Sequence, residues 1–305
     1  MYYIIVNPAS KSGMGQQKWL ELEQTLKSSL MTYQVFFTKK TADAMHFAEK
    51  ITQNNKASQI NLIVLGGDGT VNEVLNGISD FKKTVITYLP TGSSNDLARD
   101  LHISSDVSVA LNRARQLAKP RAMDYGTVQY KNGSRRFAVS CGIGYDAAIC
   151  EEAFRTKMKS ILNKIGLGKL VYVYLGIKQI TKPSAITCEL YLDDAPPLYF
   201  DQLLFSTFMI HRYEGGGVNF CPNADYHDGL LDICLINNIK GLKGLRLLPL
   251  AMLGKHEYAK EVHSYQAKKI RIKTSAPLFV HTDGEIVGKL QELTLTCEKN
   301  KLHYS

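Results

Sequence analysis

The sequence lacks the cysteine pattern of a disulfide-stapled or zinc-binding protein. Its six cysteines contain no C-x-x-C pair, and a chain of 305 residues does not need disulfide bonds to fold. Its histidines show no paired spacing typical of metal ligands, and a G-x-S-x-G motif is also missing, which argues against a hydrolase. We therefore expect reduced thiols in a cytoplasmic protein.

Long hydrophobic runs are missing as well. The longest apolar stretch, around 247–253, is far shorter than the ~20 residues that a membrane-spanning helix requires. The N-terminal MYYIIVNPAS has no basic leader, so it predicts a first strand and not a signal peptide. We therefore expect any association with a membrane to be peripheral.

Charge and length narrow the class further. Lysine and arginine total 37 against 28 aspartate and glutamate residues, and the net charge of +9 attracts an anionic membrane surface or phosphate-rich ligands. Because no nucleic-acid-binding motif accompanies this charge, we expect no nucleic-acid partner. With 45% hydrophobic and 21% charged residues the composition is globular, and the length favours two domains.

Short β-rich runs alternate with helical patterns in residues 1–125. The expected strands are 2–6, 34–38, 60–65 and 84–88, and the expected helices are 16–29, 41–53, 71–77 and 107–117. This alternation predicts an α/β nucleotide-binding domain with a doubly wound, mostly parallel sheet. Ligands of such sheets bind at the carboxyl ends of the strands, where this chain has loops rich in Gly, Ser, Asn and Asp.

After residue 125 the alternation of strand and helix patterns gives way to β-rich runs that are separated by glycines. Residues 126–286 therefore predict a second, mostly antiparallel β-sandwich domain for the substrate, and we expect a segment of about 287–305 to pack back on the first domain. Helical interruptions are expected at about 145–180 and 242–251.

A basic stretch lies within the first of these interruptions. Residues 153–183 contain seven lysines and arginines and no acid, beside an apolar stripe at helical spacing. Such a stretch fits docking on anionic lipid, and it equally fits a core-facing helix with a solvated basic side.

The most informative motif is NLIVLGGDGTVNEVLNGI, residues 61–78. A buried-strand pattern enters the turn Gly66, Gly67, Asp68, Gly69, Thr70 and leaves on a helix. Paired glycines let the backbone approach a phosphate closely, and the N–H groups at a helix start favour its negative charge. Asp68 suits a Mg²⁺ ion that bridges nucleotide phosphates. The alternative is a tight turn in which Asp68 caps the helix.

Two further loops have the same strand-to-helix placement. PTGSSNDLAR, residues 90–99, contains Ser93 and Asn95, which can donate to phosphate or ribose oxygens, and Asp96, which could equally be a helix cap. NPASKSGMG, residues 7–15, does not match the spacing of a P-loop.

A pair of acids flanks Gly284 late in the chain. Phosphoryl transfer needs a metal, positioning and a carboxylate that takes the proton of the acceptor hydroxyl, which Asp283 or Glu285 could supply. The alternative is an Asp-Gly β-turn with solvated acids.

Taken in order, NPAS, GGDGTVNEV, PTGSSNDLAR, MDYG, DGLLD and TDGE resemble the diacylglycerol kinase catalytic family, which includes bacterial soluble lipid kinases and the sphingosine and ceramide kinases. The resemblance covers essentially the whole chain. It implies a first domain like those of NAD kinases and phosphofructokinases. It also implies an ATP-dependent lipid kinase that transfers the γ-phosphoryl group to the hydroxyl of diacylglycerol or a similar lipid alcohol, with ATP and Mg²⁺ as cofactors.

The same resemblance implies roles for individual residues. Nucleotide contacts are implied for Asn7, Thr38, Gly66, Gly67, Asp68, Gly69, Thr70, Asn72, Glu73, Ser93, Asn95 and Asp96. Asp68 is an implied metal ligand, and a structural Mg²⁺ is implied at Asp228 with the carbonyls of Asp225 and Leu230. Glu285 is the implied general base, with Asp283 beside it and Asp124 extending the Mg-ATP network.

Two other functions stay open at this point. One is a kinase of a soluble acceptor such as NAD, because NAD kinases carry a turn closely similar to GGDGT. The other is a non-enzymatic nucleotide-binding protein. For the lipid kinase, the expected partner is a lipid substrate at an anionic membrane surface, and a homodimer is a possible assembly.

Overall fold

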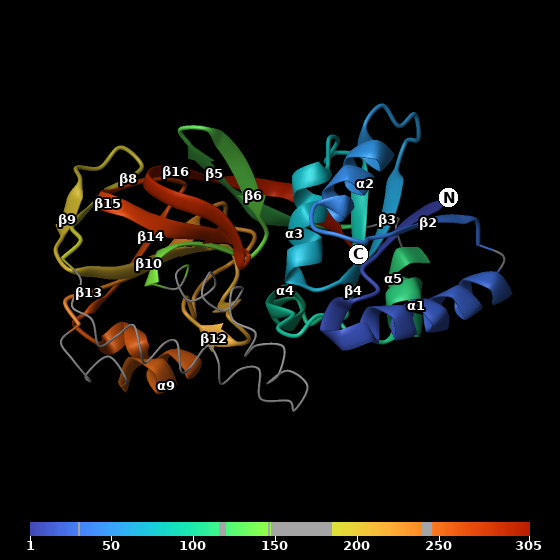
Figure 1. Ribbon diagram of the computed structural model, residues 1–305, viewed down its shortest axis with the longest axis horizontal. Helices are drawn as coiled ribbons and strands as arrows, with labels where there is room; N and C mark the ends of the chain where they lie inside the picture. Colours follow the sequence, from blue (N-terminus) through green and yellow to red (C-terminus); the bar gives the residue numbers. More distant parts are fainter. Residues whose placement is uncertain (30, 116–119, 146, 148–184, 240–245) are drawn as a thin grey trace. The chain divides into compact units, whose positions relative to one another are not determined.

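The computed structural model describes residues 1–29, 31–115, 120–145, 147, 185–239 and 246–305 (Figure 1). The described chain forms two compact units. Unit 1 consists of Met1–Tyr125, Tyr226–Asp228 and Glu298–Ser305, and unit 2 of Gly126–Asp225 and Gly229–Cys297. The basic stretch of 153–183 lies outside the described residues, as does the helix expected over 145–180 apart from residues 145 and 147.

Unit 1 is built on a parallel sheet. The order across it is β2, β1, β3, β4 and then the end of β16. The strand bounds are Tyr2–Val6 for β1, Tyr33–Phe37 for β2, Ile60–Gly66 for β3, Thr84–Pro90 for β4 and Glu285–Tyr304 for β16. The last strand of the chain thus begins in unit 2 and ends in unit 1, where His303 lies opposite Val85 of β4.

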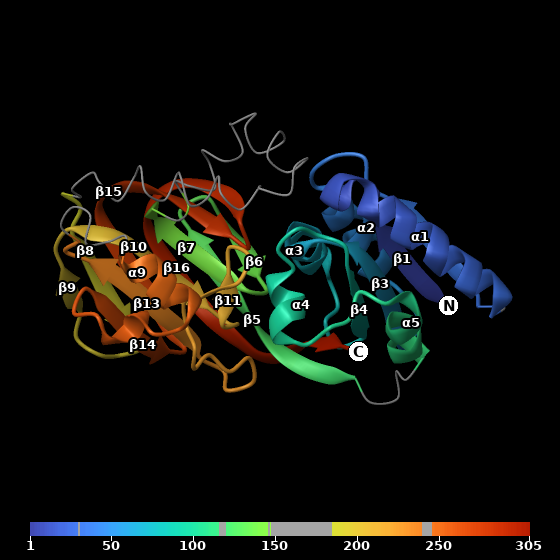
Figure 2. The ribbon, with the colours of Figure 1, turned by 90° about the horizontal axis from the view of Figure 1, so that it is seen from below.

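Helices cover both faces of this parallel sheet (Figure 2). On one face α1 packs against α5, and on the other α2 packs against α3. The helix bounds are Ser10–Ser28 for α1, Asp43–Thr52 for α2, Asp68–Gly77 for α3, Asp96–Asp100 for α4 and Val107–Arg115 for α5. The predicted doubly wound α/β fold of the first domain is confirmed.

Apolar spacing explains how one of these helices is held. Trp19, Leu22 and Leu26 follow one face of α1 and are buried against Ile63 and Leu65 of β3. Burial of each such side chain contributes about 1.5–3 kcal/mol. The helix and the central strand therefore stabilise each other across the sheet face.

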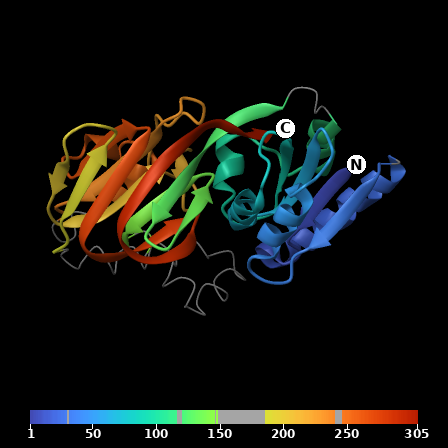
Figure 3. The same ribbon diagram turned by 90° about the horizontal axis from the view of Figure 1, so that it is seen from above.

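Unit 2 consists mainly of antiparallel strands (Figure 3). They follow the order β14, β13, β10, β7, β15 and β16, and β8 pairs with both β15 and β9. The bounds are Arg121–Tyr130 for β5, Gly133–Phe137 for β6, Ser140–Gly144 for β7, Cys188–Leu192 for β8, Leu198–Phe200 for β9, Leu203–Met209 for β10, Tyr213–Glu214 for β11, Val218–Asn219 for β12, Leu231–Asn237 for β13, Val262–Ala267 for β14 and Lys269–Thr282 for β15. The predicted antiparallel second domain is confirmed.

Two details of unit 2 refine the expected elements. The strand runs near the end of this domain include one long strand, β15, whose pairing with β16 shifts register between Lys273 and Leu278. The expected helix at 242–251 corresponds in the described chain to the short helix α9, Leu247–Met252, followed by the single-turn η2, His256–Tyr258. Among the described residues, no helix has the length and apolar character needed to cross a membrane.

Asp124 fastens three separate segments within unit 1. Its side chain is fully buried, and its Oδ1 accepts the N–H of Asn300 at 2.6 Å. Its own N–H donates to the carbonyl of Tyr226 at 2.8 Å. Nearby in the same segments, the Lys299 ammonium donates to the carbonyl of Asp228 at 3.0 Å. These hydrogen bonds hold the short central segment, Tyr226–Asp228, and the end of the chain beside β5.

We predict that Asp124→Leu lowers the free energy of unfolding of unit 1 by about 1–3 kcal/mol, because it removes the acceptor of the Asn300 amide. Asp124→Asn keeps a carbonyl oxygen there and is the matched control. Trp19 is the single tryptophan of the sequence and is buried in unit 1, so its fluorescence during denaturant unfolding reports on this unit. Equal unfolding midpoints for the Leu variant and the parent protein would contradict the role of Asp124.

Candidate functional site

The three predicted loops of unit 1 meet at the carboxyl ends of β1, β3 and β4. The Asn7 amide donates to Thr70 Oγ1 at 3.1 Å, and the hydroxyls of Ser10 and Thr91 are hydrogen-bonded at 2.7 Å. The Thr91 N–H donates to the Gly66 carbonyl at 2.8 Å. The structure therefore brings together the residues after each of these strands, as expected for an open α/β sheet.

The glycines of two of these loops permit backbone-to-backbone contact. A Cβ added to Gly92 would lie 2.5 Å from the Gly67 Cα, and one added to Gly67 would lie 3.0 Å from the Gly92 Cα. A Cβ on Gly66 would meet the Thr70 side chain at 2.4 Å. These glycines therefore serve the packing of the loops on each other, a role that the phosphate-binding interpretation of the sequence did not include.

Asp68 is the first residue of α3, but its side chain caps the neighbouring helix α4. The N-cap of α3 is Gly67 and makes no side-chain capping bond. The Asp68 carboxylate instead accepts the N–H groups of Asp96 at 3.1 Å and Leu97 at 3.3 Å, at the start of α4. One carboxylate thus fixes the GGDGT turn, residues 66–70, relative to the SSND loop, residues 93–96. A purely local analysis of the sequence could not anticipate this contact.

The SSND loop is folded by its asparagine. Asn95 has a left-handed backbone with φ of 51°, accepts the Gly92 N–H at 2.9 Å through Oδ1 and donates to the Gly92 carbonyl at 3.0 Å. Ser93 at the tip is exposed, whereas Asp96 opens α4, is buried and lies 3.7 Å from the Arg99 guanidinium. Of Ser93, Asn95 and Asp96, only Ser93 is exposed, so its predicted contact with a ligand stays a prediction.

Asp68 and Asp96 act on a common neighbour. Burial raises the pKa of Tyr88 well above its ordinary value, and the charges of Asp68 and Asp96 raise it further. The neutral Tyr88 hydroxyl donates toward the Gly66 carbonyl and Asn95 Oδ1, both at 3.3 Å. The two carboxylates therefore belong to one electrostatic neighbourhood beside the loops.

Glu73, a predicted nucleotide contact, is hydrogen-bonded to the start of helix α2. Its carboxylate oxygens accept the N–H of Ala42 at 2.9 Å and of Ala44 at 3.1 Å, at the point where the chain enters α2. Asn72 beside it is fully buried. Thr38, which directly follows β2, donates its N–H to the Val6 carbonyl at 2.9 Å and so extends the sheet.

The first loop has an unexpected backbone. Lys11, Ser12 and Gly13 all have left-handed φ values, of 42°, 57° and 99°, inside the span assigned to α1. Regular helix follows this turn, in agreement with the helix expected from residue 16. Left-handed conformations at non-glycine residues are uncommon, and no sequence signal here predicted two of them in succession.

In unit 2 the DGE triplet forms a tight hairpin turn. Asp283 and Gly284 have positive φ values of 50° and 84°, and Thr282 of β15 pairs with Glu285 of β16. An Asp-Gly dipeptide with two positive φ angles is the usual two-residue connection of a hairpin. Glu285 is therefore the first residue of β16, and its side chain is half-buried.

The Asp283 carboxylate is half-buried and hydrogen-bonded to the protein backbone in this turn. Its carboxylate accepts three backbone N–H groups, from Ala138 at 2.8 Å, Val139 at 2.8 Å and Ser140 at 2.9 Å. Its own N–H donates to the Ser140 carbonyl at 2.9 Å. Asp283 thereby anchors the turn to the link between β6 and β7, and Glu285 is the other carboxylate of the triplet.

The residues implied for a structural Mg²⁺ are divided between the units. Asp228 belongs to unit 1, whereas Asp225 and Leu230 belong to unit 2, and the Asp225 side chain is exposed. Within the described ranges, no group of three or more His, Cys, Asp or Glu side chains is arranged to hold a metal ion. The implied site consists of one carboxylate and two backbone carbonyls, so a structural Mg²⁺ at these residues stays a prediction.

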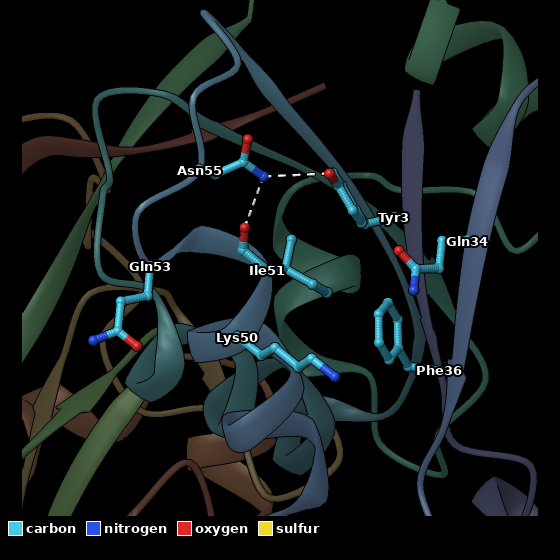
Figure 4. Close-up of a pocket in the computed structure, with 7 residues that line it drawn as sticks. All are labelled: Tyr3, Gln34, Phe36, Lys50, Ile51, Gln53 and Asn55. Atoms are coloured by element: carbon cyan, nitrogen blue, oxygen red, sulfur yellow. Dashed lines mark hydrogen bonds between the residues drawn. The ribbon is translucent and has the colours of Figure 1, made fainter.

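A hollow in unit 1 lies away from the predicted residues (Figure 4). It is lined by Tyr3, Gln34, Phe36, Lys50, Ile51, Gln53 and Asn55. The Asn55 amide spans part of it, donating to the Tyr3 hydroxyl at 3.3 Å and to the Ile51 carbonyl at 2.8 Å. Since Asn55 lies between the end of α2 and the start of β3, this hollow is toward the amino ends of the strands and contains none of the candidate site residues.

We predict that Asp283→Asn accelerates hydrogen exchange of the amides of 138–140, because one carbonyl oxygen cannot accept three N–H groups. Asparagine tolerates the left-handed backbone of the turn, so the turn itself is retained. Peptide-level exchange measured by mass spectrometry checks this.

Asp193→Asn is the matched control for that experiment. Asp193 also has a positive φ, and its carboxylate accepts two backbone amides, from Lys268 and Lys269. Its replacement should leave the exchange of 138–140 unchanged. Unchanged exchange at 138–140 in Asp283→Asn would show that the three bonds do not restrain this segment.

Two family models match the chain in succession. The diacylglycerol kinase catalytic domain matches residues 1–128, and the YegS C-terminal NAD kinase beta sandwich-like domain matches residues 139–302. The first match contains the GGDGT and SSND loops of unit 1, and the second contains the DGE hairpin of unit 2.

Curated relatives match over nearly the whole chain. "Putative lipid kinase YtlR" of Bacillus subtilis is 28% identical over 295 residues, which are 94% of this chain and 94% of the relative. A diacylglycerol kinase of Staphylococcus saprophyticus is 24% identical and covers 94% of this chain and 89% of its own length.

A solved structure has the same fold. The crystal structure of "a putative diacylglycerol kinase from Bacillus anthracis str. Sterne" superimposes with a TM-score of 0.74 at 23% identity, over 99% of this chain and 96% of that one. The fold, the two successive domain matches and the curated relatives agree. The chain belongs to the diacylglycerol kinase catalytic family and is an enzyme of the lipid kinase type.

Proposed function

We propose that this enzyme transfers the γ-phosphoryl group of ATP to the hydroxyl of diacylglycerol or a similar lipid alcohol. Family membership supports phosphoryl transfer from ATP, and the names of the relatives support a lipid acceptor. The observation that carries the mechanism is local. The Asp283 carboxylate holds the DGE hairpin by accepting three backbone amides, and the hairpin presents Glu285, at the start of β16, as the acid proposed for the chemistry.

The nucleotide is assigned to the loops of unit 1. Backbone N–H groups at the start of α3, in the turn from Gly67 to Thr70, favour the negative charge of the phosphates. Asn7 and the exposed Ser93 are the side chains proposed for further contacts at the rim. Glu73 and Asn95 support this site indirectly, because their side chains hold the backbone of the neighbouring loops.

The carboxylates of unit 1 fit a Mg²⁺ ion that arrives with ATP. Mg²⁺ in nucleotide sites is typically held by one or two carboxylates together with phosphates and waters. Asp68 and Asp96 provide two carboxylates in one neighbourhood. The hydrogen bonds that two backbone N–H groups donate to the Asp68 carboxylate fix its orientation. When bound, the ion would neutralise the charge that develops on the transferred group.

Glu285 is proposed as the general base. A lipid hydroxyl is a weak nucleophile, and its proton must leave as the phosphoryl group arrives. Glu285 would accept this proton through its carboxylate, while Asp283 holds the hairpin that presents it. Asp124 is proposed to have a structural role and not a chemical one, because its buried carboxylate accepts the backbone N–H of Asn300.

The membrane is proposed as the place of reaction, with a cytoplasmic enzyme bound peripherally. A net charge of +9 attracts an anionic lipid surface, where a lipid acceptor resides. Each basic residue near such a surface contributes about 1 kcal/mol of binding. The basic stretch of 153–183 is one proposed contact, and it lies outside the described residues.

The acceptor is tested with labelled ATP. The parent protein is incubated with Mg-ATP and either mixed lipids, NAD or no acceptor, and the labelled products are separated. We expect label in a phosphorylated lipid alcohol alone. Label in NAD would support a soluble-acceptor kinase instead, and no labelled product would overturn the proposed function.

We predict that Glu285→Gln reduces kcat by about 10²–10⁴-fold while ATP affinity is retained, because glutamine keeps the size of the side chain but cannot accept the proton. Glu292→Gln is the matched control, since Glu292 is an exposed acid farther along β16. Steady-state kinetics with a lipid acceptor check both variants. A Glu285→Gln variant with the parent kcat would remove Glu285 from the mechanism.

A further inference from the structure

A largely buried acid–histidine pair lies next to the DGE hairpin of unit 2. His281 is fully buried in β15, and its Nε2 is 3.0 Å from Glu214 Oε1. Glu214, in β11, has a side chain that is 13% exposed. Burial of two titratable groups is costly unless they are paired and hydrogen-bonded, so this pair needs an explanation.

The second nitrogen of His281 faces the hairpin turn. The Gly284 N–H donates to His281 Nδ1 at 3.2 Å. A ring nitrogen can accept this bond only when it carries no proton. Nδ1 is therefore the unprotonated nitrogen, and the proton of the neutral imidazole is on Nε2, where it is donated to Glu214.

Glu214 is held as the acceptor by its surroundings. The Thr207 hydroxyl donates to its other oxygen, Oε2, at 2.9 Å. Burial raises the pKa of the Glu214 carboxyl, but the interactions with His281 and Thr207 outweigh it and hold the pKa below its ordinary value. An ionised Glu214 thus selects the Nε2–H tautomer of His281, as carboxylates commonly do for a histidine.

The turn is consequently held from two sides. Asp283 binds the amides of 138–140, and Gly284 is bound by His281. Glu285 is the next residue, at the start of β16. A base must lie within about 3 Å of the proton that it accepts, so a small displacement of the turn is enough to impair proton transfer.

We propose that Glu214 and His281 are positioning residues for the reaction, which set the place of Glu285 through the Gly284 amide. This inference rests on the proposed role of Glu285. Neither residue touches the reacting atoms. Their function is to fix the backbone of the turn, with Glu214 selecting the tautomer of His281 that can accept the Gly284 N–H.

Two substitutions at His281 separate this role from general stability. Asparagine places an acceptor oxygen at about the reach of Nδ1, so His281→Asn keeps the bond from Gly284 and loses the contact with Glu214. Glutamine reaches to about the position of Nε2, so His281→Gln keeps a donor to Glu214 and loses the acceptor for Gly284. The two variants therefore each keep one of the two hydrogen bonds of His281, His281→Asn the one from Gly284 and His281→Gln the one to Glu214.

We expect opposite orders of stability and activity in the two variants. His281→Asn leaves the buried Glu214 with one partner fewer, so it should have the lower Tm but a kcat within about threefold of the parent. His281→Gln should have the higher Tm of the two but a kcat reduced by about 10–100-fold, with the KM for ATP unchanged. A purely structural pair would instead make kcat follow Tm.

Glu214→Gln and histidine NMR complete the experiment. Glu214→Gln retains an oxygen acceptor for Nε2–H and should keep kcat within about threefold of the parent. In the parent protein, ¹⁵N-labelled histidine should show His281 Nδ1 as an unprotonated nitrogen. A protonated Nδ1, or a parent-like kcat in a folded His281→Gln, would overturn the inference. A parent protein that phosphorylates no lipid would instead overturn the proposed function, so the two failures are distinguishable.

Discussion

Carboxylates that accept backbone N–H groups from distant parts of the chain are the interaction on which the candidate site depends. Asp68 binds the start of α4, Glu73 the start of α2, and Asp283 the link between β6 and β7. Hydrogen bonds to a charged acceptor contribute about 1.5–3 kcal/mol each, and they are directional. Loops that have few apolar side chains to pack are thereby held in one geometry.

This arrangement changes how the acids of the motifs are understood. An acid in a glycine-rich loop suggests contact with metal or substrate, yet most of these acids are already bonded to the protein itself. Two such hydrogen bonds orient a carboxylate without using all of its lone pairs, so the cap on α4 is compatible with the metal contact proposed for Asp68. Asp283 accepts three amides and thereby supports the hairpin, whereas Glu285, two residues later, is the acid proposed for the chemistry.

The sequence predicted the fold well because its strongest signals are periodic. The apolar run of β3 and the spacing of Trp19, Leu22 and Leu26 predict a buried strand and a helix without tertiary information. It also predicted which loops meet, since parallel strands end at one edge of a sheet. It could not predict that Asp283 reaches 138–140 or that Glu214 pairs with His281, because those contacts depend on strand order across more than 60 residues of sequence. The left-handed turn at Lys11 and Ser12 likewise has no local signal.

The central claim is that carboxylates shape the site before any ligand binds. Residue-resolved hydrogen exchange of the ligand-free protein tests this most directly, at the amides bonded to Glu73, Asp68 and Asp283. The account predicts slow exchange at residues 42, 44, 96, 97 and 138–140 without ATP or Mg²⁺. Exchange as fast as that of an unstructured loop, slowing only when Mg-ATP is added, would contradict it.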